Sequence, residues 1–345
     1  MKGEQLPSTD VNPEGLFYHL NGGVSPSSRT DKFNVDANTI SISEGGNSCG
    51  YVNWNPEPFF SGGHNYTLQK IVEEVSPYFL YEALKSKQTE IMALRVGSGL
   101  PNIQKKDIEK LPLYIPSKKE QNHIADFLRL VDSKVEEQSL LINNLKKYKR
   151  GLLSNLFGEK ITQGCTTKSY YFSEIAQRRS EKYDPSSGIE YPCVELENIE
   201  QETGKILATV PSTAQSSIKN IAMPGDTLFG KLRPYLRKYA FAKKTMACSS
   251  EIWALIPSDV VLPKFLFYLV QTEHFLRVAN ISSGTKMPRA EWSNIEKAEF
   301  FIPDFSVQRK VVSLLEGLDQ KITFADSTLL SLNRLKASLL QHLFI

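Results

Sequence analysis

Two stretches of the chain carry apolar residues in the seven-residue pattern of a coiled coil. Alternating steps of four and three residues in the first stretch connect Ile124, Leu128, Val131, Val135, Gln138, Ile142, Leu145, Lys149, Leu152 and Leu156. The second stretch has the same alternation at Val311, Leu315, Leu318, Ile322, Ala325, Leu329, Leu332, Lys336, Leu339 and Leu343. So narrow an apolar stripe predicts a helix that packs along a partner helix. A helix of about 40 residues would be roughly 60 Å long, since each residue adds 1.5 Å.

Only three polar residues interrupt these stripes, namely Gln138, Lys149 and Lys336, and the two lysines occupy equivalent positions. Pro116 and Pro303 precede the stretches, where a proline limits extension of a helix toward the N-terminus.

The partner of each helix is open to three interpretations. The two helices of one chain can pack together, and a two-fold arrangement would make that pair antiparallel. A helix can instead dock on its own domain, or pair with a second copy of the chain. We favour the intramolecular pair, because both stripes occur in one chain.

The chain also contains a long internal repeat. Residues 108–116 (IEKLPLYIP) return as residues 295–303 (IEKAEFFIP), an offset of 187 that holds without a gap from Gly97/Gly284 to Phe157/Phe344. A repeat of this length indicates two copies of one structural unit related by a pseudo-two-fold axis. Such an arrangement suits a two-part site on a two-fold polymer such as duplex DNA.

Two globular segments, residues 1–116 and 159–303, flank the first predicted helix, and both have mixed α and β patterns. Residues rich in β-branched and aromatic side chains predict strands at 39–43 and 251–256. Helices that open with a proline are predicted at 77–84 and 263–270. The segments resemble each other at their ends and diverge in their middles, as expected for different ligand specificities on one frame.

Composition limits the classes of function. The 345 residues include 41% apolar and 23% charged residues and carry a net charge of +3, so nucleic-acid affinity must come from local basic patches. No apolar run approaches membrane-spanning length, and the N-terminus lacks the apolar region of a secretory signal. The four cysteines (Cys49, Cys165, Cys193 and Cys248) form no CxxC pair. We therefore expect a cytoplasmic protein with reduced thiols, no metal site and no membrane contact.

Signatures of enzyme chemistry are missing from the sequence. It contains no GxxxxGK[ST] phosphate loop, no HExxH and no GxSxG, and its five histidines form no ligand-like cluster. We therefore predict no catalytic residues.

The strongest candidate for ligand binding is the basic segment 224–239, PGDTLFGKLRPYLRKY. A turn and a short apolar strand lead into a loop that interleaves cationic and aromatic residues: Lys231, Arg233, Tyr235, Arg237 and Lys238. Lysine and arginine neutralise phosphates, and arginine also reads guanine edges. The alternative interpretation is a β-hairpin with a solvated basic face.

A second group of candidates lies in two glycine-rich stretches of the first segment, 42–51 and 59–66. Here Ser43 and Ser61 could bind phosphate, and Asn47, His64 and Asn65 could bond to base edges. Tight turns in which glycine supplies positive φ explain these stretches equally well, and without further support we prefer that explanation. Arg178 and Arg179 are weaker phosphate-contact candidates.

The layout of the chain resembles the specificity subunit of type I restriction–modification systems. The resemblance rests on the repeated segments 111–121 and 298–308 that lead into each helix, and on 225–234 (GDTLFGKLRP), which resembles a recurrent feature of that family's target recognition domains. The stretches 42–51 and 61–66 resemble one subtype of those domains.

The resemblance implies an α+β fold with two pseudo-two-fold-related α/β target recognition domains separated by two long antiparallel coiled-coil helices. The boundaries would be 1–116 for the first target domain, 117–158 for the first spacer helix, 159–303 for the second domain and 304–345 for the second helix. The first domain is 30 residues shorter than the second, counted as 96 residue steps from Met1 to Gly97 against 126 from Gly158 to Gly284. We expect that it lacks an opening piece.

The resemblance also implies a function. The chain would be a non-catalytic reader of a bipartite, asymmetric double-stranded DNA target, and its helices would dock two methyltransferase subunits, with restriction subunits added. AdoMet, ATP and Mg²⁺ would then bind to those partners. A coiled-coil scaffold that does not bind DNA is the alternative, and an enzyme of unrecognised type is disfavoured by the missing motifs.

Overall fold

The computed structural model of the chain describes residues 1–97, 99–158, 167–281 and 287–344. Cys165 and Gly284 lie outside these residues. The chain divides into two compact units, unit 1 with Met1–Leu140 and Asp326–Ile345, and unit 2 with Leu141–Ala325. Each unit therefore contains one globular segment, the first part of one long helix and the last part of the other.

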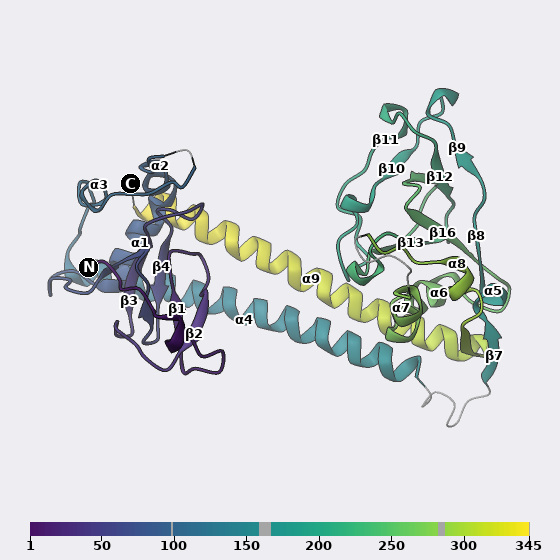
Figure 1. Cartoon of the computed structure of the whole chain (residues 1–345), viewed down its shortest axis with the longest axis horizontal. Helices are drawn as coiled ribbons and strands as arrows, with labels where there is room; N and C mark the ends of the chain where they lie inside the picture. The colour runs from purple at the N-terminus through teal and green to yellow at the C-terminus, as the bar shows by residue number, and fades with distance from the viewer. Residues whose placement is uncertain (98, 159–166, 282–286, 345) are drawn as a thin grey trace. The chain divides into compact units, whose positions relative to one another are not determined.

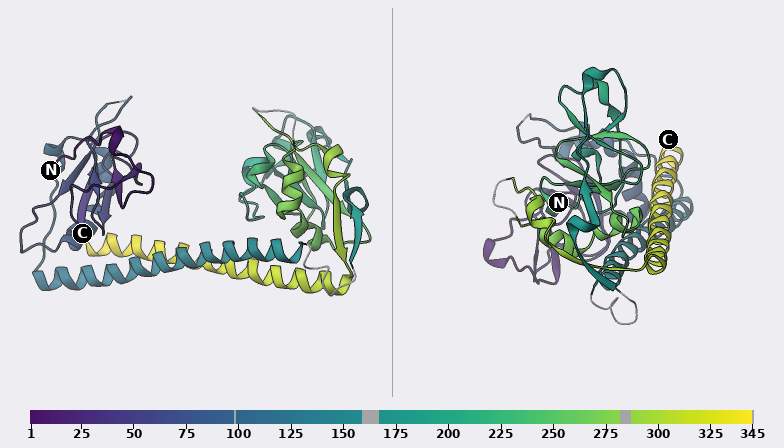
Figure 2. Two further views of the ribbon diagram at one scale, coloured as in Figure 1. Left: turned by 60° about the horizontal axis from the view of Figure 1, so that its bottom comes forward. Right: turned by 90° about the vertical axis from the view of Figure 1, so that its right-hand side faces the viewer.

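The two long helices are α4 (Lys118–Leu156) and α9 (Phe305–Leu343), of 39 residues each. They fall inside the segments 117–158 and 304–345 expected for them. In unit 1, buried Leu128 of α4 shares an apolar cluster with Leu339 and Leu340 of α9 and with Phe344, which follows the helix. In unit 2, buried Leu153 of α4 shares a cluster with Val311 and Leu315 of α9. In each unit the end of one helix thus packs beside the beginning of the other (Figure 2), which confirms an intramolecular antiparallel pair.

Of the seventeen apolar residues in the two stripes, Ala325 is buried, Leu156 is half-buried and Leu343, at the end of α9, is 37% exposed. The other fourteen all lose solvent exposure in the structure. Seven are buried: Leu128, Val131, Ile142, Val311, Leu315, Leu318 and Ile322. The other seven are half-buried: Ile124, Val135, Leu145, Leu152, Leu329, Leu332 and Leu339. The seven-residue pattern therefore identified the packed face of both helices.

Unit 1 carries two small sheets and three short helices (Figure 1). Its strands are β1 (Phe17–Leu20), β2 (Ser28–Thr30), β3 (Thr39–Ser43), β4 (Val52–Asn55), β5 (Phe60–Ser61) and β6 (Asn65–Leu68), in the orders β2-β1-β5 and β4-β3-β6. Its helices are the 3-10 turn η1 (Ser8–Asp10), α1 (Pro77–Ser86), α2 (Gln88–Ala93) and α3 (Lys105–Ile108). The predicted strand 39–43 is the fully buried central strand β3, and the predicted helix 77–84 is α1.

Unit 2 carries a five-stranded, a four-stranded and a two-stranded sheet, in the orders β11-β10-β15-β12-β9, β14-β13-β16-β8 and β17-β7. The strands are β7 (Thr167–Tyr171), β8 (Ala176–Arg178), β9 (Lys182–Tyr183), β10 (Pro192–Val194), β11 (Val210–Pro211), β12 (Lys219–Ala222), β13 (Thr227–Gly230), β14 (Tyr239–Phe241), β15 (Met246–Cys248), β16 (Ile252–Pro257) and β17 (Glu299–Pro303). The helices are α5 (Phe172–Ile175), α6 (Pro263–Leu269), α7 (Glu273–Ala279) and α8 (Trp292–Ile295), with 3-10 turns η3 (Pro185–Ser187), η4 (Leu196–Asn198), η5 (Ser212–Ala214) and η6 (Pro234–Leu236). The predicted strand 251–256 and helix 263–270 are β16 and α6, each within one residue of the expected bounds.

A pair of equivalent glutamines joins each globular segment to its long helix. Gln121 is 1% exposed; its side-chain oxygen accepts from the amide of Ser76, the N-cap of α1, at 2.8 Å. Gln308, also 1% exposed, accepts in the same way from the amide of Leu262, the N-cap of α6, at 2.8 Å. Both side chains thus satisfy a backbone donor that the helix itself leaves unpaired. The repeat preserves a specific contact as well as an apolar pattern.

Two expectations from the sequence, reduced thiols and no membrane contact, concern the cysteines and the hydropathy of the chain. Cys49, Cys193 and Cys248 are buried and free of disulfides. Burial raises the pKa of Cys248 to about 12, which disfavours the reactive thiolate. Within the described residues, no helix combines the length and the apolar character that crossing a membrane requires.

Candidate nucleic-acid interface

The basic loop of unit 2 lies between β13 and β14, which pair antiparallel, so the segment is indeed a hairpin. Its 3-10 turn η6 is flanked by Arg233 and Arg237, whose φ angles are 50° and 51°. These left-handed conformations are costly for residues with a side chain and persist only where neighbouring structure imposes them. Two backbone hydrogen bonds hold this turn in place. The amide of Arg233 donates to the backbone oxygen of Pro288 at 2.7 Å, and the amide of Ala290 donates to the backbone oxygen of Lys231 at 2.8 Å.

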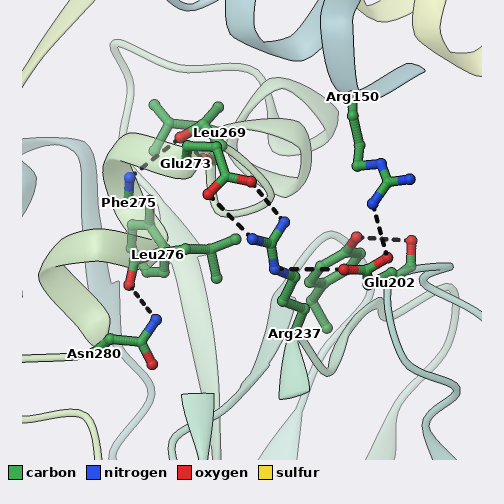
Figure 3. A network of polar contacts seen from close by, with 10 residues as sticks. Arg150, Glu202, Arg237, Leu269, Glu273, Phe275, Leu276 and Asn280 are labelled. Atoms are coloured by element: carbon green, nitrogen blue, oxygen red, sulfur yellow. Dashed lines mark hydrogen bonds and ion pairs between the residues drawn. The ribbon is translucent and has the colours of Figure 1, made fainter. Parts of the chain in front are cut away.

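Only part of the loop's positive charge faces solvent freely. Arg237 donates to both carboxylate oxygens of Glu273 at 2.6 and 3.1 Å, and its Nε lies 3.4 Å from Glu202 (Figure 3). Burial lowers the pKa of Arg237, but the hydrogen bonds to Glu273 and the negative charges of Glu273 and Glu202 together outweigh it, so the net shift is upward. The ammonium of Lys238 donates to the backbone oxygen of Leu196 at 2.6 Å. Arg237 and Lys238, both predicted to contact DNA, therefore hold the loop to its own unit.

Arg233 and Tyr235 are the loop residues that the structure presents outward. Both are exposed, Tyr235 to 53%. Within the described part of the chain, no carboxylate lies in ion-pair distance of Arg233, since the ion pairs of this loop belong to Lys231 and Arg237. A cation beside an exposed aromatic ring can bind phosphate while the ring contacts sugar or base.

Beside this loop lies an open depression of about 550 Å³, which we call the basic depression. Its lining includes Arg178, Lys231, Trp253, Arg289 and Trp292. The guanidinium of Arg178 lies 4.9 Å from the ring centre of Trp292 and 5.9 Å from that of Trp253. Both distances are in the range of cation–π attraction, which orients the cation without neutralising it.

Carboxylates only partly balance the basic depression. Glu251 serves two cations: it lies 4.0 Å from the ammonium of Lys231 and accepts from Arg289 at 3.1 and 3.3 Å. Glu291 also lines the wall. Three cations therefore share the depression with two carboxylates, an arrangement that attracts an anionic polymer and positions aromatic faces beside it.

Arg179, the neighbour of Arg178, has a different role from the predicted phosphate contact. Its side chain is 13% exposed and bonds to both oxygens of Asp226 at 2.6 and 3.0 Å. The hydrogen bonds that Arg179 donates to Asp226 raise the pKa of the guanidinium. Since Asp226 is 2% exposed and also accepts from the amide of Met223 at 2.8 Å, this pair stabilises the turn before β13. The prediction for Arg179 was wrong, because its charge is already paired inside the fold.

Three of the candidates in unit 1 are also internal. Ser43, Ser61 and Asn65 are all 0% exposed. The hydroxyl of Ser43 donates to the oxygen of Gly22 at 2.8 Å, and the amide of Asn65 donates to the hydroxyl of Ser61 at 3.3 Å. A buried side chain cannot contact phosphate or a base edge, so these three predictions were wrong. The three residues lie at strand ends, Ser43 in β3, Ser61 in β5 and Asn65 in β6, so they are not turn residues either.

Asn47 and His64 are exposed in unit 1, and their proposed contacts stay predictions. Sequence reasoning missed Trp253, Arg289 and Trp292. Trp253 lies on β16, Trp292 lies on α8, and Arg289 precedes α8. Only the folded sheet and the backbone hydrogen bond at Pro288 bring them beside Arg178 and Lys231. No local pattern around any of them indicates this.

Residues within the described ranges form no group of three or more histidine, cysteine, aspartate or glutamate side chains that could hold a metal ion. The candidate interface consists of cations, aromatic rings and backbone, and its principal members are Arg178, Lys231, Arg233, Tyr235 and Arg289.

Known proteins share this architecture. Residues 12–147 and 172–334 match the family described as the type I restriction modification DNA specificity domain. A protein of Mycoplasma genitalium named as a type I specificity subunit is 40% identical over 158 residues, which are 45% of this chain and 41% of that protein. The chain thus spans less than half the length of this curated relative.

Solved structures agree with the sequence matches. The crystal structure of a type I restriction-modification S subunit from M. genitalium is 27% identical, with a TM-score of 0.67 over 100% of this chain and 93% of that one. A chain from a structure on complex assembly and conformational transition of the type I R-M system is 14% identical, with a TM-score of 0.57 over 99% and 94% of the two chains, and shows the same fold. With two matched stretches that together cover most of its length, the chain belongs to the type I restriction modification DNA specificity family.

Proposed function

We propose that this chain is the DNA-recognition subunit of a type I restriction–modification complex and reads a bipartite, asymmetric duplex target. The observation that carries the proposal is the basic depression of unit 2 with the outward-facing Arg233 beside it. Cations that carboxylates balance only in part, next to aromatic faces, suit a polyanion with stacked bases. Family membership and the duplicated frame support a second target domain in unit 1.

The two units differ where they would meet DNA. Unit 2 presents the basic depression, whereas the exposed candidates of unit 1 are Asn47 and His64 on glycine-rich turns. Two unlike surfaces on one repeated frame would recognise two unlike half-sites, which makes the target asymmetric.

The long helices would dock two methyltransferase subunits, to which restriction subunits are added. Each unit exposes an equivalent apolar pair on its helices, Phe127 and Leu335 in unit 1, Leu314 and Tyr148 in unit 2. These four side chains are 48–60% exposed, and the offset of 187 relates Phe127 to Leu314 and Tyr148 to Leu335. Exposed apolar residues that recur at equivalent positions suit two copies of one partner.

Catalysis would then belong to the partners. We propose that AdoMet, ATP and Mg²⁺ bind to the methyltransferase and restriction subunits, and that this chain contributes recognition and positioning in the cytoplasm.

Charge reversal in the basic loop tests the proposal. A complex of the chain with a type I methyltransferase subunit should bind duplex DNA, and Lys231→Glu with Arg233→Glu should weaken binding and flatten its dependence on salt concentration. The matched control is Lys243→Glu with Lys244→Glu, two exposed lysines of the same unit outside the loop. Equal affinity and salt dependence of the loop variant and the wild type would contradict DNA recognition and favour the scaffold interpretation.

A further inference from the structure

The two lysines that interrupt the apolar seams have matching environments. In unit 2 the side chain of Lys149 on α4 is 8% exposed, and its ammonium lies 2.6 Å from a carboxylate oxygen of Asp319 on α9. In unit 1 the side chain of Lys336 on α9 is 17% exposed and donates to Asp132 on α4 at 2.5 Å. Each lysine thus crosses from one long helix to the other.

A tyrosine from the globular segment completes each group. Tyr268 of α6 donates its hydroxyl to the second oxygen of Asp319 at 2.9 Å. Tyr78 of α1 donates in the same way to the second oxygen of Asp132 at 2.5 Å. Burial, reinforced by the neighbouring aspartate, raises the pKa of both tyrosines, so each stays a neutral donor.

Each carboxylate therefore binds a lysine with one oxygen and a tyrosine with the other. We call these groups the helix locks: Tyr268–Asp319–Lys149 in unit 2 and Tyr78–Asp132–Lys336 in unit 1. Both connect three elements, namely the two long helices and one helix of the globular segment, α6 in unit 2 and α1 in unit 1.

The repeat makes the locks complementary. Asp132 and Asp319 are equivalent at the offset of 187, as are Lys149 and Lys336. Each helix thus carries an aspartate and, 17 positions later, a lysine. A parallel pairing with the repeats aligned would place aspartate opposite aspartate and lysine opposite lysine, whereas the antiparallel pairing satisfies both.

The locks also distinguish the native register from its neighbours. In an antiparallel pair of helices, the numbers of facing residues have the same sum along the whole pair. This sum is 468 for both Asp–Lys pairs, so both form in one register. A slip of the helices by one heptad would place Lys336 opposite Ala125 or Ser139, neither of which is charged. The apolar seam alone discriminates poorly against such slips, because apolar residues recur in every heptad.

We propose that the duplicated Tyr–Asp–Lys groups are register-setting locks, which select the antiparallel alignment of the two long helices and fix each globular segment to that alignment. Ion pairs removed from water add little net stability compared with well-packed apolar residues. Their benefit is selection, since a slipped helix would leave a charge without its partner. The inference rests on the proposed function in one respect: a fixed register would also fix the distance between the two half-sites.

Unit 2 offers the cleaner test, because its lysine contacts one carboxylate, whereas Lys336 also lies 3.1 Å from Glu82. Lys149→Met and Asp319→Leu, made singly, should each lower the Tm of the chain by about 5 to 10 °C. Asp319→Leu leaves the buried ammonium of Lys149 without its carboxylate, and Lys149→Met leaves the half-buried carboxylate of Asp319 with Tyr268 alone. The exchange of Lys149→Asp with Asp319→Lys should restore most of that loss. The control Lys147→Met, at an exposed position of α4, should change the Tm little.

The double variant Lys149→Met with Asp319→Leu separates register selection from stability. It should regain a Tm near that of the wild type. When Lys336→Met and Asp132→Leu remove the lock of unit 1 as well, the methyltransferase complex that contains the chain should methylate sites with more than one gap length. An exchange variant as unstable as the single variants, or a variant without either lock that keeps one gap length, would overturn the proposal. If the wild-type complex methylates no two-part site, the proposed function fails, and recovery of the Tm in the exchange variant still decides whether the lock exists.

Discussion

The guanidinium of Arg237 and the carboxylate of Glu273 form a two-bond ion pair, with donor–acceptor distances of 2.6 and 3.1 Å. The pair connects the basic loop to the first turn of α7, and Glu202 adds a second carboxylate on the same cation (Figure 3). A residue that looks like a DNA contact in the sequence is therefore a positioning residue in the fold. It holds in place the strained turn from which Arg233 and Tyr235 project.

Substitutions of Arg233 and Arg237 should affect DNA binding in different ways. The affinity for DNA falls as the salt concentration rises. Arg233→Ala should make the slope of log affinity against log salt less steep by about 0.9, the value for one lost phosphate contact. Arg237→Ala should weaken binding with little change of slope, because carboxylates already neutralise that cation. Equilibrium binding at several salt concentrations measures both, with Lys243→Ala as the exposed control. If Arg237→Ala also made the slope less steep by the amount for one phosphate contact, this residue would contact phosphate.

The adjacent arginines of β8 should separate binding from stability. Arg179→Ala removes the partner of buried Asp226 and should lower the free energy of unfolding by about 3 to 5 kcal/mol. Arg178→Ala, at an exposed position in the basic depression, should weaken DNA binding while changing stability by less than about 1 kcal/mol. Denaturant unfolding and DNA binding of both variants test this contrast, which fails if Arg178→Ala is the more destabilising of the two.

The equivalent glutamines should be important for the stability of both units. Gln308→Met removes the hydrogen-bond partner of the amide of Leu262 and of the backbone oxygens of Val260 and Pro303. The substitution should lower the free energy of unfolding by about 2 to 4 kcal/mol. Gln320→Met, at an exposed position on the same helix, is the matched control. Denaturant unfolding should show a clear difference between the two, and equal midpoints would mean that the buried amide contributes nothing beyond its volume.

Unit 1 should respond to pH through Glu82. Its side chain is fully buried, and burial raises its pKa to about 7, although Lys336 acts in the opposite direction. Between the ordinary carboxyl pKa and 7 the folded chain holds a proton that the unfolded chain releases. The contribution of this group to stability therefore falls as pH rises from about 5 to 7.

Glu82→Gln should remove that contribution. The Tm of the variant relative to the wild type should rise as the pH increases from 5 to 7, whereas Glu90→Gln, at an exposed position, should show no such trend. A difference between Glu82→Gln and the wild type that stays constant across this range would contradict a raised pKa.

The features that sequence reasoning predicted well are periodic. The heptad pattern located both long helices and their packed faces, and it marked Lys149 and Lys336 as exceptions. The offset of 187 paired each exception with its equivalent. Periodic patterns survive in a single sequence because the helix itself repeats.

The site was predicted less well, because burial and long-range partners decide it. The glycine-rich sequence around Ser43 and Ser61 does not show whether these side chains face solvent or the interior, and in the structure both are buried. Asp226, 47 positions away, neutralises Arg179, and the local sequence around either residue does not indicate this ion pair. Trp253 and Trp292 meet Arg178 only after strands and helices from three parts of unit 2 assemble. Local sequence supplies the types of residue, and the fold decides which of them remain accessible.

The most direct test of DNA recognition by this chain is a map of methylated adenines in DNA exposed to the complex of the chain with a type I methyltransferase. The account predicts one two-part, asymmetric motif with a gap of constant length, which disappears when the chain is omitted and weakens with Lys231→Glu and Arg233→Glu. Methylation that is the same without the chain, or that follows a single uninterrupted motif, would contradict it.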